Sequence, residues 1–282
     1  MFTRRWRFIL LLFILLSGAT ASFAQTTDKQ KAELEWMLRV FPKSEPWEQW
    51  LKTTGELPPD FDALPRQAAL PDPLLADADG KKVRLSSPGE WPGQRERLVG
   101  LVKRIQWALG EEPPTAVDVL EQVPFVDPKR IFVAGYSMGA MVGLHAAALD
   151  DRIAGVASVA GFTPMRLDKT DNGAAFVARW SRWHVLQPRL GAFVGQERRI
   201  PYDYHEVLAL IAPRPLLVVV APKVDSENTS ADVEKCVAEV QKVYSLFDAE
   251  ERLELRSPDD YNRYSPELQS QVNAWVKQAA NR

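Results

Sequence analysis

The segment around residue 137 constrains the fold more than any other part of the chain. Residues 130–134, RIFVA, contain a short apolar run that predicts a buried strand. GYSMG follows at 135–139, and the Ala-rich segment after it predicts a helix. A serine at such a strand-to-helix turn, with a glycine two residues before it and two after it, is typical of a nucleophile elbow. The alternative is an ordinary glycine-rich turn, and the flanking strand and helix favour the elbow.

The position of Ser137 in this turn has a chemical consequence. Its hydroxyl would lie at the N-terminus of the helix, where backbone N–H groups and the helix dipole favour developing negative charge. Ser137 is therefore the candidate catalytic nucleophile.

The first residues have the pattern of a secretory signal peptide over 1–24. Residues 3–7 are basic, residues 8–16 are apolar but too short to span a bilayer, and small residues follow up to Ala24. An uncleaved N-terminal anchor is the alternative. We expect an exported chain, periplasmic or secreted, with no stable membrane insertion after the signal is cleaved.

Net charge and cysteine content exclude some classes of binding partner and of covalent cross-link. The formal net charge is −2, and it is about −5 without the three arginines of the leader, which argues against a general surface for nucleic acid or anionic membrane. Cys236 is the single cysteine, so an intramolecular disulfide is excluded.

The N-terminal part of the chain predicts helices and irregular segments. Apolar residues recur at helical spacing in 31–41 and in 88–109. Residues 55–75 are rich in proline and predict an irregular segment, while 77–85 allow at most a short edge strand. We expect a helical, Pro-rich N-terminal arm over residues 25–114.

Three tryptophans of this arm, Trp36, Trp47 and Trp50, have two interpretations. They could form stacking platforms for carbohydrate, or they could pack helices against the core. The second interpretation is favoured because tryptophan supplies a large apolar surface for core contacts.

Residues 115–282 alternate predicted strands and helices, which indicates an α/β fold with a parallel sheet and right-handed crossovers. We expect four parallel strands in sequential order, with helices on both faces. The predicted strands lie at 130–134, 152–162, 215–221 and 252–260.

Several motifs together resemble those of the α/β-hydrolase superfamily, and within it exported acetyl xylan esterase-like and dienelactone hydrolase-like proteins. They are GYSMG, DDRIAGVASVAGFTP, and IPYDYHEVLALIAPRPLLVVVAP at 200–222. The resemblance covers residues 115–278 and implies a serine hydrolase of carboxylic esters, such as acetylated polysaccharide, that needs no metal or cofactor. It assigns the nucleophile to Ser137, the acid to Asp225, and an oxyanion-binding backbone N–H to Met138.

The sequence departs from this superfamily in two ways. About four strands should precede the nucleophile strand, and none is recognisable in 25–129, so the loop that donates a second oxyanion N–H is missing as well. The catalytic histidine should follow the last strand, but Asn262 stands about where it belongs. Asparagine cannot accept a proton from Ser137 and return it. The chain therefore predicts the C-terminal part of an α/β-hydrolase domain.

Other residues could replace the missing base. His145 lies too far along the elbow helix to reach Ser137 and is expected to be structural. His205 and His184 remain open as bases from unusual chain positions, although a structural or surface role is favoured for each. Asp259 and Asp260 are poorly matched to serine because of their low ordinary pKa. The carboxylates Asp171, Glu197 and Glu206 are expected to be solvated.

Two functions follow from this pattern. The first is an exported esterase, and the second is a catalytically inactive relative that serves as a binding module or arose by internal deletion. The missing strands also predict that 130–134 is an exposed sheet edge, which favours a homodimer or aggregates.

Overall fold

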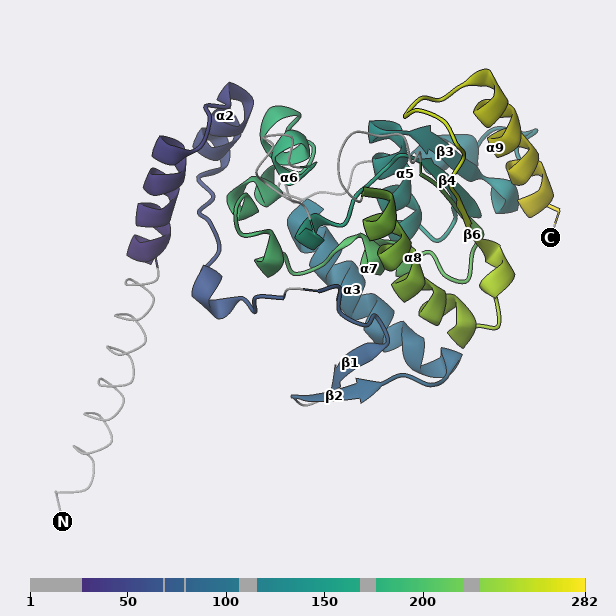
Figure 1. The fold of residues 1–282 in the computed structure, drawn as a ribbon, viewed down its shortest axis with the longest axis horizontal. Coiled ribbons are helices and arrows are strands. Elements are labelled where there is room, and N and C mark those ends of the chain that lie inside the picture. Colours follow the sequence, from purple (N-terminus) through teal and green to yellow (C-terminus); the bar gives the residue numbers. More distant parts are fainter. Residues whose placement is uncertain are drawn as a thin grey trace, which may run out of the picture.

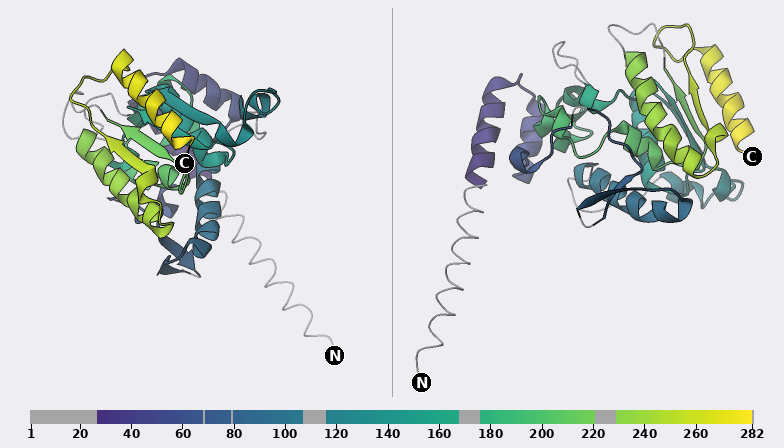
Figure 2. Two further views of the ribbon diagram at one scale, coloured as in Figure 1. Left: turned by 90° about the vertical axis from the view of Figure 1, so that its right-hand side faces the viewer. Right: turned by 60° about the horizontal axis from the view of Figure 1, so that its bottom comes forward.

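The computed structural model describes residues 27–67, 69–78, 80–106, 116–167, 176–220 and 229–281. The leader therefore lies outside the described residues. Figures 1 and 2 show the arrangement of the described elements.

A four-stranded parallel sheet forms the centre of the C-terminal part. Its strands are β3 (Phe132–Tyr136), β4 (Gly155–Val159), β5 (Leu216–Val219) and β6 (Leu253–Arg256), and they lie side by side in the order β3-β4-β5-β6. Every neighbouring pair is parallel. The prediction of four parallel strands in sequential order is therefore confirmed, and β3 lies at one edge as expected.

Helices cover both faces of this sheet (Figure 1). The helices α5 (Met138–Leu149), α7 (Tyr204–Ala209) and α8 (Thr229–Leu246) pack over one face, where Leu216 and Val218 point into the main apolar core. Helix α9 (Pro266–Ala279) packs over the other face against Leu217 and Val219. The alternation along β5 follows from the two-residue period of a strand, and a strand buried on both faces is therefore continuously apolar.

The N-terminal arm contains helices and one separate hairpin. The hairpin strands β1 (Leu75–Ala78) and β2 (Lys81–Arg84) pair with each other and do not join the parallel sheet. The expected short edge strand is therefore half of an independent hairpin. The helices of the arm are residues 27–40, α2 (Glu45–Thr54), η1 (Phe61–Ala63), η2 (Pro88–Glu90) and α3 (Trp91–Gln106). Two further short helices, α4 (Ala116–Leu120) and η3 (Pro128–Arg130), lie between the arm and β3.

A long excursion of short helices connects β4 to α7, and α2 packs against it (Figures 1 and 2). Trp47 of α2 is 1% exposed, donates its indole N–H to the Pro188 carbonyl at 2.9 Å, and lies under the Arg182 guanidinium. Trp36 is 42% exposed, and its ring packs edge-on against Phe41. Trp47 is thus a core contact. The excursion's elements are η4 (Met165–Leu167), α6 (Phe176–Ala178), η6 (Arg179–Trp183), η7 (Pro188–Phe193) and η8 (Glu197–Arg199). A separate short helix, η9 (Glu250–Arg252), lies between α8 and β6.

Candidate functional site

Ser137 occupies a sharp turn between the end of β3 and the start of α5. Its backbone has φ 53° and ψ −118°, a conformation that non-glycine residues rarely adopt. The turn is held because Ser137 N–H donates to the Val159 carbonyl at 2.9 Å and Met141 N–H donates to the Ser137 carbonyl at 3.0 Å. The Ser137 side chain makes no capping hydrogen bond to the helix. This strained backbone at a strand-to-helix turn matches a nucleophile elbow.

The two glycines of the motif differ in their surroundings. A Cβ atom on Gly135 would lie 2.4 Å from the backbone carbon of Gly139, so the turn requires glycine at position 135. A Cβ atom on Gly139 would meet no atom within 4 Å. Neighbouring backbone therefore approaches closely at the first glycine, whereas none of the described residues does so at the second.

Met138 is the first residue of α5 and is 45% exposed. The first N–H groups of a helix have no partner within the helix, so the N–H of Met138 points away from the turns that follow. An oxyanion formed next to Ser137 would lie at this positive end of the helix dipole.

The loop after β6 returns to the nucleophile strand. Strand β6 lies three strands from β3, about 14 Å away at the usual strand spacing. Nevertheless, the Tyr136 hydroxyl donates to the Asn262 carbonyl at 2.9 Å, and the Tyr136 ring stacks on Tyr264 with centroids 5.9 Å apart. The structure therefore brings Asn262, which is exposed, beside the residue that precedes Ser137.

Asp225 lies outside the described residues, between the end of β5 and the start of α8. The neighbouring candidates Asp259 and Asp260 follow β6. Asp260 accepts from the Arg263 guanidinium at 3.0 Å and forms an ion pair with it.

The three histidines have different surroundings. His145 is buried in α5, where its Nδ1 lies 2.9 Å from the Met141 carbonyl, and burial lowers its pKa to about 4. His205 is completely buried in α7, and burial together with the nearby Arg166 guanidinium lowers its pKa to about 3. His184 is exposed at the end of η6, and its ring lies 5.3 Å from that of Trp180. None of the described contacts of these rings involves Ser137.

A buried carboxylate cluster at the start of α7 was missed by the sequence analysis. The Asp203 carboxylate is completely buried and accepts N–H bonds from Met165, Arg166 and Tyr204 at 2.7–2.9 Å. Glu206 is 5% exposed and accepts the Asp203 N–H at 2.9 Å. Burial raises the pKa of Asp203, and it raises the pKa of Glu206 to about 7.

The expectation that Glu206 and Glu197 are solvated is therefore wrong. Both are buried, and each offsets part of the cost of burial by accepting a backbone N–H, Glu197 from Gly195 at 2.7 Å. The D-x-x-E spacing of Asp203 and Glu206 is a capping-box signal that could have identified the first of these. Asp171 lies outside the described residues.

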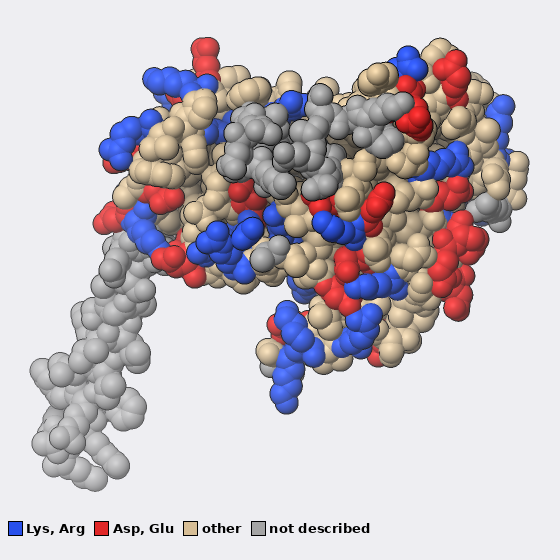
Figure 3. Space-filling view, in the orientation of Figure 1, with Lys and Arg blue, Asp and Glu red and all other residues tan. Residues whose placement is uncertain are grey.

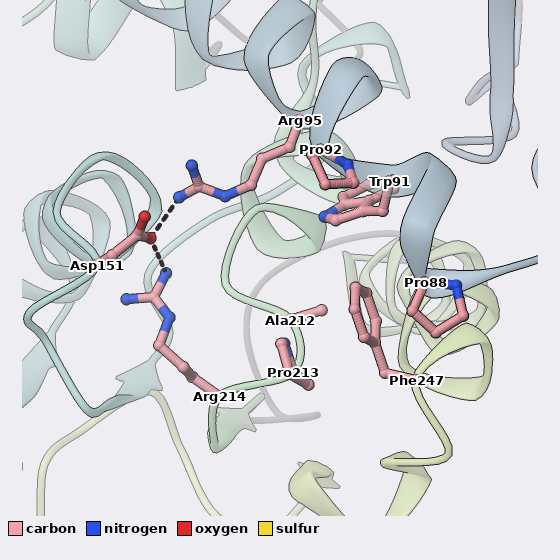
Figure 4. A pocket seen from close by; sticks show the side chains of 9 residues that line it. All are labelled: Pro88, Trp91, Pro92, Arg95, Asp151, Ala212, Pro213, Arg214 and Phe247. Carbon is pink, nitrogen blue, oxygen red and sulfur yellow. Dashed lines mark hydrogen bonds and ion pairs between the residues drawn. The ribbon is translucent and has the colours of Figure 1, made fainter.

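A pocket of about 340 Å³ lies at the end of the sheet that is opposite to Ser137 (Figure 4). Trp91, Phe247 and three prolines line it, and its polar wall is Asp151, which pairs with Arg95 and Arg214. Arg214 precedes β5, so this wall belongs to the amino ends of the strands. Ser137 lies at the carboxyl end of β3, and the pocket is therefore separate from the elbow.

On the face drawn in Figure 3, basic and acidic side chains of the described residues are interspersed, so neither sign of charge dominates there. Among the described residues, no three His, Cys, Asp or Glu side chains are grouped so as to hold a metal ion. No helix in the described ranges is both long and apolar enough to cross a membrane.

Sequence comparisons relate the chain to esterases. The family model described as "Glucuronyl esterase, fungi" matches residues 100–248, a little more than half of the chain. A polyketide transferase ATR5 from Stachybotrys chlorohalonatus is 34% identical over 127 residues, which cover 44% of this chain and 41% of that protein. A 4-O-methyl-glucuronoyl methylesterase from Neurospora crassa is 32% identical over 125 residues, covering 40% of this chain and 31% of that protein. The chain thus spans well under half the length of these curated relatives.

A comparison of structures supports the same fold. The crystal structure of a glucuronoyl esterase from Sporotrichum thermophile matches with a TM-score of 0.59 and 14% identity, covering 77% of this chain and 89% of that one. The expected α/β-hydrolase-type fold is therefore confirmed. The finer likeness to acetyl xylan esterase-like and dienelactone hydrolase-like proteins stays a prediction.

Proposed function

The chain belongs to the glucuronyl esterase family, and from this premise we propose that it is an exported carboxylic-ester hydrolase with Ser137 as its nucleophile. The observation that carries the proposal is the strained backbone of Ser137, φ 53°, at the turn from β3 to α5. Such strain persists only where the surrounding structure enforces it, and it is concentrated at functional sites.

The proposed chemistry is acyl transfer in two steps. The Ser137 Oγ attacks the ester carbonyl, its proton goes to a base, and the alcohol leaves with a proton. Water then hydrolyses the acyl-enzyme, which releases the acid and restores the serine. The Met138 N–H would stabilise the oxyanion of both steps, and Asp225 would orient the base.

The proposed substrate is an ester that involves a sugar of a polysaccharide. The name of the Neurospora relative indicates a methyl ester of 4-O-methyl-glucuronic acid, in which the sugar supplies the acyl group. Acetylated polysaccharide, the expectation from the sequence, is the other candidate, and there the sugar supplies the alcohol. The attack by Ser137 is the same in both cases.

A second candidate function is a catalytically inactive binding module. It is favoured by Asn262, which stands in the sequence about where the histidine belongs and cannot relay a proton, and whose backbone carbonyl accepts from the Tyr136 hydroxyl. The absence of a second oxyanion donor would by itself lower turnover by about two to three orders of magnitude. We therefore propose that turnover by the chain as it stands is low.

The proposed organisation is a signal peptide over 1–24, an arm over 25–114, and the C-terminal part of a hydrolase domain over 115–282. A product of internal deletion would have this organisation, and an intact reading frame with no lost segment near codons 110–115 of the encoding DNA would weaken that explanation.

The test is to restore the base. We expect that Asn262→His raises hydrolysis of p-nitrophenyl acetate and of methyl glucuronate by about a hundredfold, because general-base catalysis contributes about 10²–10⁴. Asn262→Gln is the matched control and should leave turnover at its original low level. Combining Asn262→His with Ser137→Ala should abolish the gain.

Three results would contradict the proposal. One is turnover by the unmodified chain within tenfold of an ordinary esterase that is lost in Ser137→Ala, which would show that a base is already present. Another is failure of Asn262→His to increase either turnover or fluorophosphonate labelling of Ser137. The third is a large loss in Asp225→Asn without the added histidine, because Asp225 should matter only when a histidine is there to orient.

A further inference from the structure

We propose that the outer edge of β3 is an interface between two copies of this chain, which pair antiparallel about a two-fold axis at Ala134. The surface consists of the strand Phe132–Tyr136 and the exposed side of α5, and we call it the β3 edge surface. The inference is independent of the proposed esterase activity.

The backbone of β3 has one paired side and one open side. Residues 131 and 137 direct backbone groups toward β4, because Ala154 N–H donates to the Ile131 carbonyl and Ser137 N–H donates to the Val159 carbonyl. Alternate residues of a strand direct these groups to opposite sides, so Phe132, Ala134 and Tyr136 direct theirs outward. No other described strand pairs with β3 on that side.

The side chains of β3 do not protect this edge. The strand FVAGY carries no charge and no proline, the two features that usually keep an edge from pairing with another chain. The opposite edge of the sheet differs, because β6 carries Glu254 and Arg256. The edge that invites pairing is therefore β3.

The exposed side of α5 extends the apolar surface beside β3. The helix carries no charged side chain from Met138 to Leu149, and a helix that is apolar all round is normally buried on every side. Here Met138 is 45% exposed and Val142 is 51% exposed. The turn that leads into β3 adds Phe125, which is 90% exposed. Exposed apolar side chains thus lie in the segments that precede and follow the strand in the chain.

The strand is complementary to a second copy of itself. In a two-fold antiparallel pair centred on Ala134, Phe132 lies opposite Tyr136 of the partner subunit, and Ala134 lies opposite the partner's Ala134. All three outward residues then form pairs that exchange two hydrogen bonds each. The aromatic cross-strand pairs add stability, and the small side chain at the axis allows close approach.

Charge agrees with this register. The basic residues Lys129 and Arg130 precede β3, and the register places them opposite the partner's Gly139 and Met138 rather than opposite each other. Like charges opposite each other would destabilise a strand pair, and the two-fold arrangement centred on Ala134 contains none within the paired residues.

The test uses the charge of residue 134. We expect the unmodified chain to be a dimer by light scattering after size exclusion, and both Ala134→Lys and Ala134→Glu to weaken it at least about tenfold, because identical charges meet at the axis. An equimolar mixture of the two variants should restore the dimer, since Lys and Glu then face each other. Val83→Lys is the matched control on an exposed position of β2 and should leave the dimer intact.

Hydrogen exchange supplies a measurement that needs no variant. The amides of Phe132, Ala134 and Tyr136 should gain protection as the protein concentration rises. A monomer at the highest soluble concentration would overturn the proposal, as would a dimer that neither charge variant weakens. Polymers larger than a dimer would overturn the two-fold arrangement, and so would a mixture of the charge variants that stays monomeric.

Discussion

At the two ends of the parallel sheet, helix termini bind side chains of opposite charge. At the amino end, the Arg214 guanidinium donates to the carbonyls of Ala147, Asp150 and Ile153, near the C-terminus of α5, at 2.6–3.1 Å. At the carboxyl end, the Asp203 carboxylate accepts the N–H groups at the start of α7. Both arrangements follow the helix dipole, which favours a cation at the C-terminus and an anion at the N-terminus.

The two ends differ in how their polar side chains are used. The Arg214 guanidinium donates to backbone carbonyls, and these hydrogen bonds stabilise the fold at the amino end. At the carboxyl end Ser137 has a strained backbone and a hydroxyl that does not cap its helix, as its proposed role of nucleophile requires. Three predictions test this contrast, from the largest expected effect to the smallest.

The largest effect is expected at the amino end. Replacing Arg214 by Met should lower the free energy of unfolding by about 3 kcal/mol, because several buried carbonyls lose their donor. Arg152→Met is the matched control, since Arg152 is itself 39% exposed and pairs with carboxylates near the same helix end, and its effect should be much smaller. Urea unfolding followed by circular dichroism measures both, and equal losses would contradict the contrast.

The two glycines of the elbow should respond in opposite directions. Gly135→Ala should destabilise the protein by about 2–3 kcal/mol, because the added Cβ atom would collide with the backbone of Gly139 and Ala140. Gly139→Ala lies in open space on a helix and should stabilise it by about 0.5–1 kcal/mol. If thermal unfolding showed a loss of stability in both, the turn would be more crowded than described.

The smallest effect concerns pH at the carboxyl end. The pKa of Glu206 is raised to about 7 in the folded state, above its ordinary value of 4.5, so its contribution is fully present below about pH 4.5 and is lost as pH rises through about 7. Glu206→Gln keeps the acceptor for the Asp203 N–H and should therefore be more stable than the parent at pH 8 by about 1–2 kcal/mol. At pH 4.5 the two should be equal, and a constant difference between these pH values would contradict the assignment.

Local patterns predicted much of the fold. The order of strands and helices from residue 130 onward and the sharp turn at Ser137 both follow from short-range patterns that neighbouring residues determine. The sheet order followed as well, because sequential βα units prefer adjacent parallel strands. The position of β3 at an edge was predictable as well, since no strand of the parallel sheet is recognisable in residues 25–129.

Contacts between distant segments could not be predicted in this way. Glu197 and Glu206 have ordinary surface residue types, and only the packing of the excursion against α7 and its neighbours buries them. Likewise, the sequence places Asn262 after the last strand, but the hydrogen bond from Tyr136 that draws its loop to the elbow joins residues 126 positions apart. Gly139 has the same residue type as Gly135, and only the absence of described atoms around it distinguishes the two.

The sequence by itself therefore determined the sharp turn at Ser137 and the strand order, because these depend on residues close together in the chain. Tertiary structure alone decided which carboxylates are buried, which pKa values shift and which polar groups remain unused. The physical reason is that burial and hydrogen bonding across the sheet arise from segments that meet only after the chain has folded.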